Sequence, residues 1–241
     1  MKLRTSAAIA PLRKEPSDRS EMVSQALFGE AMVMLDQNEK WAMVRMEIDH
    51  YEGWIDRKQI EPYSSDSNLQ LITQPLVHAV MPDGTSITLP AGAYVDESID
   101  LLESLPIWSG SENDITACAK AFLHAPYLWG GRTLMGMDCS GFTQLVMRLN
   151  GVSLPRDAHQ QAEHGETVSF LEETTTGDLA FFDNADGRII HVGIVLKDEN
   201  GRSNIIHASG KVRIDPIDHQ GIYNRDTGSY SHQLRIVKRL Q

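Results

Sequence analysis

Cys139, one of two cysteines in the sequence, has neighbours that suit a reactive thiol. It lies in the stretch DCSGF, where Asp138 precedes it and a run typical of a helix follows. Asp138 is well placed as the N-cap of that helix. A cysteine in the first turn has its thiolate stabilised by unpaired amides and by the helix dipole, which lowers its pKa. A helix cap followed by a merely buried thiol fits these five residues equally well.

Two histidines favour the interpretation of Cys139 as a nucleophile over that of a buried structural thiol. His191 opens the strand-like stretch HVGIVL, and His207 lies near the end of SNIIHAS. A thiol nucleophile needs a base to take its proton, and that base needs a third group to hold its ring. Zinc accepts the same three side chains, but no C-x-x-C or H-E-x-x-H motif accompanies them. We therefore expect catalysis by Cys139, His191 and His207, with neither a metal nor a cofactor.

The link between the two histidine strands decides whether the two rings can meet. A two-residue turn at Asn200–Gly201 would put the histidines on opposite faces, because side chains alternate along a strand. A three-residue loop pairs Asp198 with Arg202 and places His207 opposite Gly193. The two histidines are then diagonal neighbours on one face, within reach of each other. The catalytic interpretation thus predicts an odd-length loop or a bulge.

The second cysteine has an ordinary structural setting. In ITACAKAF, Ile115, Cys118, Ala119 and Phe122 recur at the spacing of one helical face, which predicts a buried core position for Cys118. Two cysteines in such different settings do not indicate a disulfide framework.

Composition excludes several classes of partner. The 241 residues are 41% hydrophobic and 23% charged, which is typical of a globular protein with one or two domains. A formal net charge of −11 disfavours nucleic acid and anionic membranes as partners. No stretch approaches the roughly 20 apolar residues that span a bilayer. The basic N-terminus has a shorter apolar run than a secretory signal needs, so we expect a cytoplasmic location.

The chain changes character twice. Residues 1–62 carry short strand-like runs separated by turns, which predicts a small antiparallel barrel. Residues 63–110 begin polar and contain the turn signal Pro82–Gly84, and they fit either an abbreviated second β module or a linker. From residue 111 onward, two helices precede a run of strands, which is an α+β layout.

The two helices have recognisable ends. Ser111 and Asp114 form a candidate capping pair for the first helix. The second helix begins at Cys139 and is predicted to end at Asn150–Gly151. Its buried stripe is Phe142, Leu145, Val146 and Leu149.

Five pieces of residues 111–241 together resemble a known family. In order they are YLWGGRTLMGMDCSGF, LPRDAHQQ, GDLAFF, IIHVGIVL and IIHAS. They resemble the NlpC-type cell-wall cysteine peptidases, which have a papain-like α+β fold and a triad of cysteine, histidine and a polar third member. The preceding segment, whose pattern ends in GWI, resembles the all-β bacterial SH3-like barrel of the γ-D-glutamyl-L-diamino acid endopeptidases, which trim peptidoglycan stem peptides.

The resemblance implies a role for each matching residue. Cys139 would be the nucleophile, His191 the general base and His207 the residue that orients its ring. Tyr127 would contribute a hydroxyl to the oxyanion site, although an aromatic ring packed in a loop is the alternative. The matching groove positions are Asp138, Ser140, Arg156 and Asp157, and Asp157 also fits a surface ion pair or a turn.

The resemblance also implies a substrate. Members of this subgroup use the SH3-like segment to close one end of the groove, so that only a peptide with a free N-terminal L-alanine fits. Glu15 and Tyr51 are our candidates for holding that amine, and a solvent-facing Glu15 with a packed Tyr51 fits as well. We expect a hydrolase that cuts the γ-D-Glu–diamino acid bond of small murein peptides and acts as a monomer. Alternatives are an amidase or acyltransferase, and a cell-wall-binding module without catalysis.

Overall fold

The computed structural model describes residues 2–64, 68–102 and 114–240. The chain divides into two compact units, which are described separately below. The first comprises Met1–Gly110 with Trp129–Leu134, and the second comprises Ser111–Leu128 with Met135–Gln241. Among the described residues, no helix is long and apolar enough to cross a membrane.

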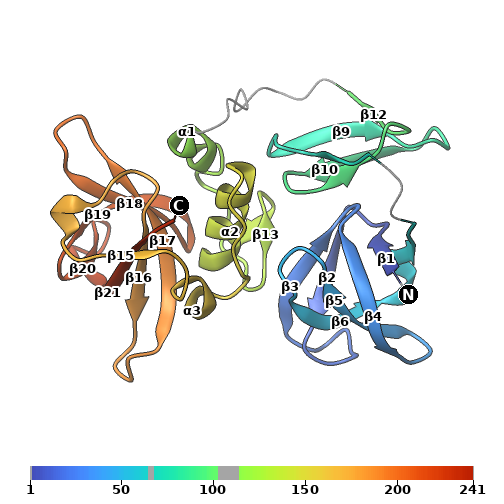
Figure 1. Cartoon of the computed structure of the whole chain (residues 1–241), viewed down its shortest axis with the longest axis horizontal. Coiled ribbons are helices and arrows are strands. Elements are labelled where there is room, and N and C mark those ends of the chain that lie inside the picture. Colours follow the sequence, from blue (N-terminus) through green and yellow to red (C-terminus); the bar gives the residue numbers. More distant parts are fainter. Residues whose placement is uncertain (1, 65–67, 103–113, 241) are drawn as a thin grey trace. The chain divides into compact units, whose positions relative to one another are not determined.

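The first unit contains a seven-stranded antiparallel sheet, in the order β3-β2-β6-β5-β4-β1-β7 (Figure 1). Each of β1 to β6 contributes to one core, whose fully buried members include Leu12, Met32, Val44 and Ile55. Strands β1, β2 and β6 alternate buried and more exposed residues, so one face of the sheet is turned towards that core. The strands are β1 (Lys2–Thr5), β2 (Ile9–Arg13), β3 (Met22–Leu27), β4 (Ala31–Gln37), β5 (Trp41–Met46), β6 (Glu52–Asp56) and, after a 3₁₀ turn (Arg57–Gln59), β7 (Ile60–Pro62).

The described part of residues 63–110 forms short strands of its own. They make two small sheets, β10-β9-β12 and β11-β8. The predicted turn lies between β9 and β10, and Gly84 in it adopts a φ of +83°. Val77 and Leu89 pack with Leu27 and Phe28 in one cluster, so this β module shares a core with the end of β3. The strands are β8 (Gln70–Leu71), β9 (Leu76–Val80), β10 (Ser86–Pro90), β11 (Tyr94–Val95) and β12 (Asp100–Leu101).

The second unit begins with its helices, which start where the sequence predicts. Asp114 caps α1 (Ile115–Lys120) by accepting a hydrogen bond of 2.9 Å from the Ala117 amide, whereas Ser111 lies outside the described residues. Asp138 caps α2 (Cys139–Leu149) by accepting one of 2.7 Å from the Gly141 amide. The predicted stripe of α2 is buried, and Gly151 follows its C-cap with a φ of +82°. The other short elements of this unit are β14 (Gly136–Met137), α3 (Ala158–Gln161) and a 3₁₀ turn (Leu171–Glu173), whereas β13 (Arg132–Thr133) belongs to the first unit.

The strands of the second unit close on themselves. The sheet runs β15-β21-β16-β17-β18-β19-β20, and β20 also pairs with β21, so six strands form a closed ring. Phe182, Val195, Ile205 and Ile222 belong to the cluster inside this ring. The strands are β15 (Glu166–Val168), β16 (Leu179–Asp183), β17 (Ile189–Lys197), β18 (Ser203–Ser209), β19 (Lys211–Asp218), β20 (Gly221–Asn224) and β21 (Ser229–Arg239).

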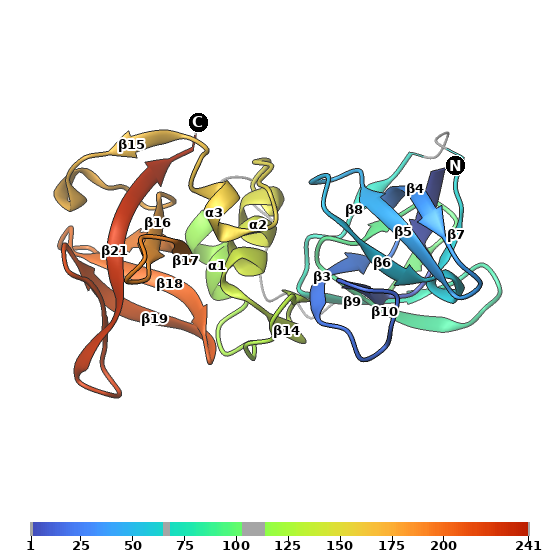
Figure 2. The same cartoon turned by 90° about the horizontal axis from the view of Figure 1, so that it is seen from below.

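The helices of the second unit gather on the β17 side of this barrel (Figures 1 and 2). Helix α2 contacts β17 and β18, and α3 contacts β17. The helices therefore pack on antiparallel strands, as an α+β layout predicts, but closure of the sheet was not predicted. Strands β19 and β20, which complete the ring, were also missed.

Candidate active site

The thiol of Cys139 faces the strand that carries His191. Cys139 is the first residue of α2, and its side chain is 8% exposed. The backbone amide of Val192, in β17, donates a hydrogen bond to its sulfur. Because Val192 follows His191 directly, packing of α2 on β17 brings the thiol to the neighbourhood of the histidine.

The loop between β17 and β18 has the length that the catalytic interpretation requires. The strands pair from Ile194 opposite Ile206 to Lys197 opposite Ser203, and the Asp198 amide bonds the Arg202 carbonyl at 3.0 Å. Three residues remain in the loop, and the last of them, Gly201, adopts a φ of +75°, as three-residue hairpin loops do. The prediction of an odd-length loop is confirmed.

This register brings the two histidine rings together. His191 Nε2 lies 2.8 Å from His207 Nδ1, and both side chains are buried. A Cβ atom added at Gly193 would lie 2.9 Å from the His207 Cβ, so the glycine makes room for that side chain. By strand alternation the histidines share the barrel-interior face with Val195 and Ile205.

His207 has a second partner that the sequence did not reveal. Its Nε2 lies 3.2 Å from Asp215 Oδ2, and Asp215 is 1% exposed. Arg213 Nε donates to the same oxygen at 2.6 Å, and an Arg213 terminal nitrogen donates to Oδ1 at 2.9 Å. The signal for this pair was weak because Pro216 in the same stretch argues against a strand.

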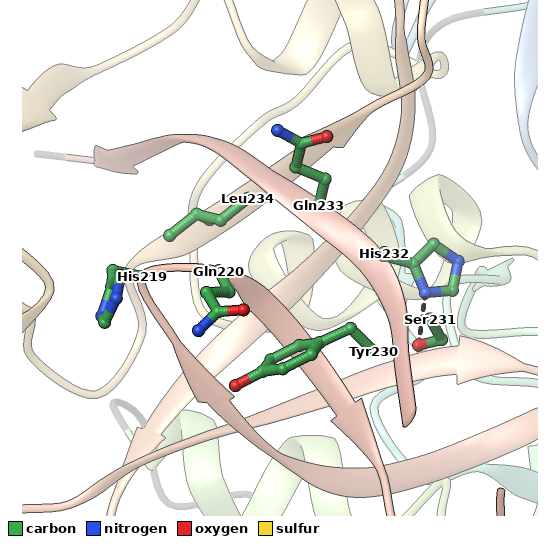
Figure 3. Close-up of a pocket in the computed structure, with 7 residues that line it drawn as sticks. All are labelled: His219, Gln220, Tyr230, Ser231, His232, Gln233 and Leu234. Carbon is green, nitrogen blue, oxygen red and sulfur yellow. Dashed lines mark hydrogen bonds between the residues drawn. The ribbon is translucent and has the colours of Figure 1, made fainter. Parts of the chain in front are cut away.

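A third histidine, His232 of β21, completes the cluster and was also missed. Its ring stacks on that of His191, with centroids 4.1 Å apart and planes inclined by 21°. Ser231 Oγ lies 2.9 Å from His232 Nδ1. The turn after β19 and strand β21 line a pocket of about 510 Å³. Figure 3 shows His232 at one end of these lining residues and His219 at the opposite end.

The electrostatics of the cluster favour a neutral pair at rest. Burial, and next the carboxylate of Asp138, raise the pKa of Cys139 to about 11. Burial, and next the neighbouring His207 and His232, hold the pKa of His191 well below its usual value. The expectation that the helix start lowers the pKa of this thiol is therefore wrong, since loss of solvation dominates. The thiol keeps its proton until a base takes it.

Tyr127 lies beside the start of α2. Its amide donates to the Gly210 carbonyl at 3.0 Å, and it forms an isolated parallel bridge with Met137, two residues before Cys139. Burial, and next the nearby Cys139, raise the pKa of Tyr127 to about 12. Its 37% exposed side chain is therefore a protonated hydrogen-bond donor across the neutral pH range.

Asp138, Ser140 and Arg156 form one buried network. Arg156 donates to the two carboxylate oxygens of Asp138 at 3.0 and 2.6 Å and to Ser140 Oγ at 2.9 Å. Arg156 is 1% exposed, so its guanidinium supports Asp138 and Ser140 from within and does not line a groove. Asp157 is half-buried at the N-cap of α3, where its amide donates to Gln160 at 3.3 Å, so the alternative of a turn residue describes its geometry.

The two candidates for amine binding lie in the first unit. Glu15 is exposed just after β2, and its amide donates to Ser20 Oγ at 2.9 Å. Tyr51 is half-buried immediately before β6. Their assignment to an ammonium site stays a prediction. Within the described ranges, no group of three or more histidine, cysteine, aspartate or glutamate side chains is arranged to hold a metal ion.

Comparison with known proteins identifies both parts of the chain. The model of the NlpC/P60 family matches residues 124–230, and that of the bacterial dipeptidyl-peptidase SH3 domain matches residues 12–60. The chain is 35% identical over 126 residues to a probable endopeptidase NlpC of Escherichia coli, covering 50% of this chain and 70% of that protein.

More extended similarities reach across both units. A γ-D-glutamyl-L-lysine dipeptidyl-peptidase of Bacillus subtilis is 29% identical over 217 residues, which cover 77% of this chain and 71% of that protein. The crystal structure of an NlpC/P60 family protein from Bacillus cereus covers 99% of both chains with a TM-score of 0.78 at 20% identity, which supports the fold. The chain therefore belongs to the NlpC/P60 family of peptidases and carries a bacterial SH3-like domain at its N-terminal end.

Proposed function

We propose that this protein is a cysteine endopeptidase with papain-like catalysis, which cuts the γ-D-Glu–diamino acid bond of murein stem peptides that have a free N-terminal L-alanine. The observation that carries the proposal is the buried contact of 2.8 Å between His191 and His207, on the strand whose Val192 amide donates to the Cys139 sulfur. A thiol nucleophile needs a base of this kind, and the base needs a group that orients its ring. The named activity of the Bacillus relatives supports the choice of bond.

We assign the proton transfers of the reaction as follows. His191 Nε2 is engaged with His207, so Nδ1 is the nitrogen left to take the proton of Cys139 as its sulfur attacks the scissile carbonyl carbon. The C–N bond then breaks, and the leaving amine takes that proton from His191. A water molecule, deprotonated by His191, attacks the resulting thioester. Release of the carboxylic acid returns the proton to the Cys139 sulfur.

The oxyanion formed in both steps needs hydrogen-bond donors. We assign the Tyr127 hydroxyl and the Cys139 backbone amide to this role. The raised pKa of Tyr127, about 12 because of burial and next of Cys139, supports the assignment because a protonated phenol can donate.

Substrate length follows from the same proposal. A dipeptidyl-peptidase removes two residues from a free N-terminus, which is the length of L-Ala-γ-D-Glu, and the Bacillus relatives carry that description. Glu15 would pair with the ammonium group, and Tyr51 would contact it. Requirement for a free amine would spare the intact wall, whose L-alanine is acylated. A monomeric, cytoplasmic enzyme of peptide recycling fits this restriction.

Mass spectrometry of products from L-Ala-γ-D-Glu-diamino acid peptides tests the proposal. We expect L-Ala-γ-D-Glu from the free peptide and at least about tenfold slower cleavage after N-acetylation, because a desolvated carboxylate loses its charged partner at a cost of about 1–3 kcal/mol. Glu15→Gln and Tyr51→Phe should reduce the difference in cleavage rate between the free and the N-acetylated peptide. Equal cleavage of both peptides would refute the free-amine requirement. Cleavage or transfer at another amide would favour an amidase or acyltransferase, and binding without turnover would favour a wall-binding module.

A further inference from the structure

The hydrogen-bond chain in the barrel does not end at His207. It runs from His191 Nε2 to His207 Nδ1 at 2.8 Å, and from His207 Nε2 to Asp215 Oδ2 at 3.2 Å. All three side chains are at most 5% exposed, so water is largely kept from the chain. The last acceptor of this hydrogen-bond chain therefore decides which ring nitrogen of each histidine carries the proton.

We propose that Asp215, anchored by Arg213, is a positioning residue that sets the tautomers of His207 and His191. This inference rests on the proposed function, because it concerns the base of that reaction. An ionised carboxylate only accepts hydrogen bonds, so His207 Nε2 must donate to it. In neutral His207 the other nitrogen, Nδ1, then accepts, and His191 Nε2 must donate. Nδ1 of His191 is thereby left without a proton, as a base requires.

The opposite tautomers would inactivate the base. If His207 carried its proton on Nδ1, its Nε2 lone pair would face the Asp215 carboxylate, which is repulsive. His191 Nε2 would then accept, and the proton of His191 would occupy Nδ1, the nitrogen that must receive the thiol proton. Asp215 thus acts on the reaction through two imidazole rings without touching the reacting atoms.

Arg213 keeps Asp215 ionised and fixed. Burial alone would raise the pKa of Asp215, but hydrogen bonds from His207 and Arg213 outweigh it and lower this pKa to about 2. The guanidinium is itself held by Asp226 at 2.8 Å and by Asn224 at 3.3 Å. Its positive charge also balances that of Asp215, whose two carboxylate oxygens it bonds at 2.6 and 2.9 Å.

The ring-nitrogen shifts of the histidines in ¹⁵N NMR test the inference independently of activity. In the unmodified full chain, we expect His207 and His191 to be protonated on Nε2 with Nδ1 bare. A wild-type spectrum with bare Nε2 on His207 would overturn the proposal without any variant. Lack of peptidase activity with the expected tautomers would refute the proposed function but leave this inference standing.

Variants add a second, graded readout. Asp215→Asn keeps the shape, whereas Asp215→Leu removes the acceptor. The double variant with Arg213→Leu avoids leaving the half-buried Arg213 without its Asp215 partner. We expect mixed tautomers and a kcat at least about tenfold lower with little change in KM, most severely without the acceptor. Asp218→Asn is the matched control, because Asp218 lies on the same strand but accepts from Tyr230 instead of a histidine. Unchanged tautomers in folded Asp215→Asn and Asp215→Leu would overturn the inference.

Discussion

The imidazole of His232 stacks on that of His191, with ring centroids 4.1 Å apart. Burial, and next the proximity of His207, lower the pKa of His232 to about 4, so the stacked ring is neutral near pH 7. The stack packs against one face of the His191 ring, and we infer that it holds this ring in the orientation that the proposed mechanism needs.

Two replacements of His232 distinguish the contribution of its aromatic ring from that of its basic nitrogen atoms. We expect His232→Phe to keep kcat within about threefold, because a phenyl ring preserves the stack, and His232→Ala to lower kcat about tenfold. His219→Ala is the matched control, since His219 lines the other end of the same pocket. Steady-state kinetics of the three variants measure these effects. An equal kcat in His232→Ala and the wild-type enzyme would show that His232 takes no part in the mechanism.

The loss of kcat/KM at low pH should follow the protonation of the buried His191. Burial, and next His207 and His232, hold the pKa of His191 well below 6.5, and only its neutral form can take a proton. Activity is therefore retained as the pH falls to 6.5 and is lost only at lower pH, as His191 becomes protonated. A kcat/KM profile measured at constant ionic strength checks this, and half-loss of activity at or above pH 6.5 would contradict it.

Alkylation should distinguish the two cysteines. Cys118 is fully buried, and burial raises its pKa to about 12, so we expect it to resist iodoacetamide in the folded protein. Cys139 is 8% exposed, and in the proposed mechanism His191 takes its proton, so it should be labelled first. Peptide mapping should find the label on Cys139 and much slower labelling in His191→Ala. Inactivation by a chelator instead of iodoacetamide would favour a zinc site formed by the same three side chains.

Local patterns were sufficient to predict the start of α2, which the aspartate before Cys139 marks. They were not sufficient for the loop between the histidine strands, because Asn200–Gly201 also fits a two-residue turn. The expectation of an odd-length loop came from the catalytic interpretation together with the two-residue period of strands. The barrel closure, Asp215 and His232 depend on which strands pair at long range, and the pairing of β20 with β21 has no local signature.

The pKa of Cys139 could not be predicted from sequence for a different reason. A helix start stabilises a thiolate, but how much solvation the thiol loses depends on the tertiary packing around it. Arg156 illustrates the same limit. The motif placed it at the groove, whereas its burial against Asp138 and Ser140 makes it a support for the residues that precede and follow the nucleophile.

Gly193 provides a test of the shared face. A Cβ atom there would lie 2.7 Å from two Ile205 side-chain atoms and 2.9 Å from the His207 Cβ. Ile205 can rotate, but the His207 Cβ moves only with its backbone, so Gly193→Ala should displace His207 and lengthen its contact with His191. We expect kcat to fall at least about tenfold with KM little changed. Urea unfolding measured in parallel controls for stability, and full activity in a folded variant would contradict the predicted displacement.

The last prediction concerns the first unit, where Arg132 and Glu30 form a buried ion pair. Their side chains are 3% and 1% exposed, and two guanidinium nitrogens lie 3.0 and 3.1 Å from the Glu30 carboxylate. Arg132 also donates to the Gln25 carbonyl at 2.6 Å. Removing one partner leaves a buried charge without its counterion, which costs about 3–5 kcal/mol.

We therefore expect Arg132→Met to lower the free energy of unfolding of the first unit by several kcal/mol, about as much as Glu30→Leu. The double variant should be more stable than either single variant, because it leaves no buried charge uncompensated. Arg45→Met is the matched control, since Arg45 faces Glu52 at 3.9 Å with both side chains about half exposed, and exposed pairs contribute at most about 1 kcal/mol. Urea unfolding followed by tryptophan fluorescence measures all four variants. Additive losses in the double variant would show that the two side chains act independently.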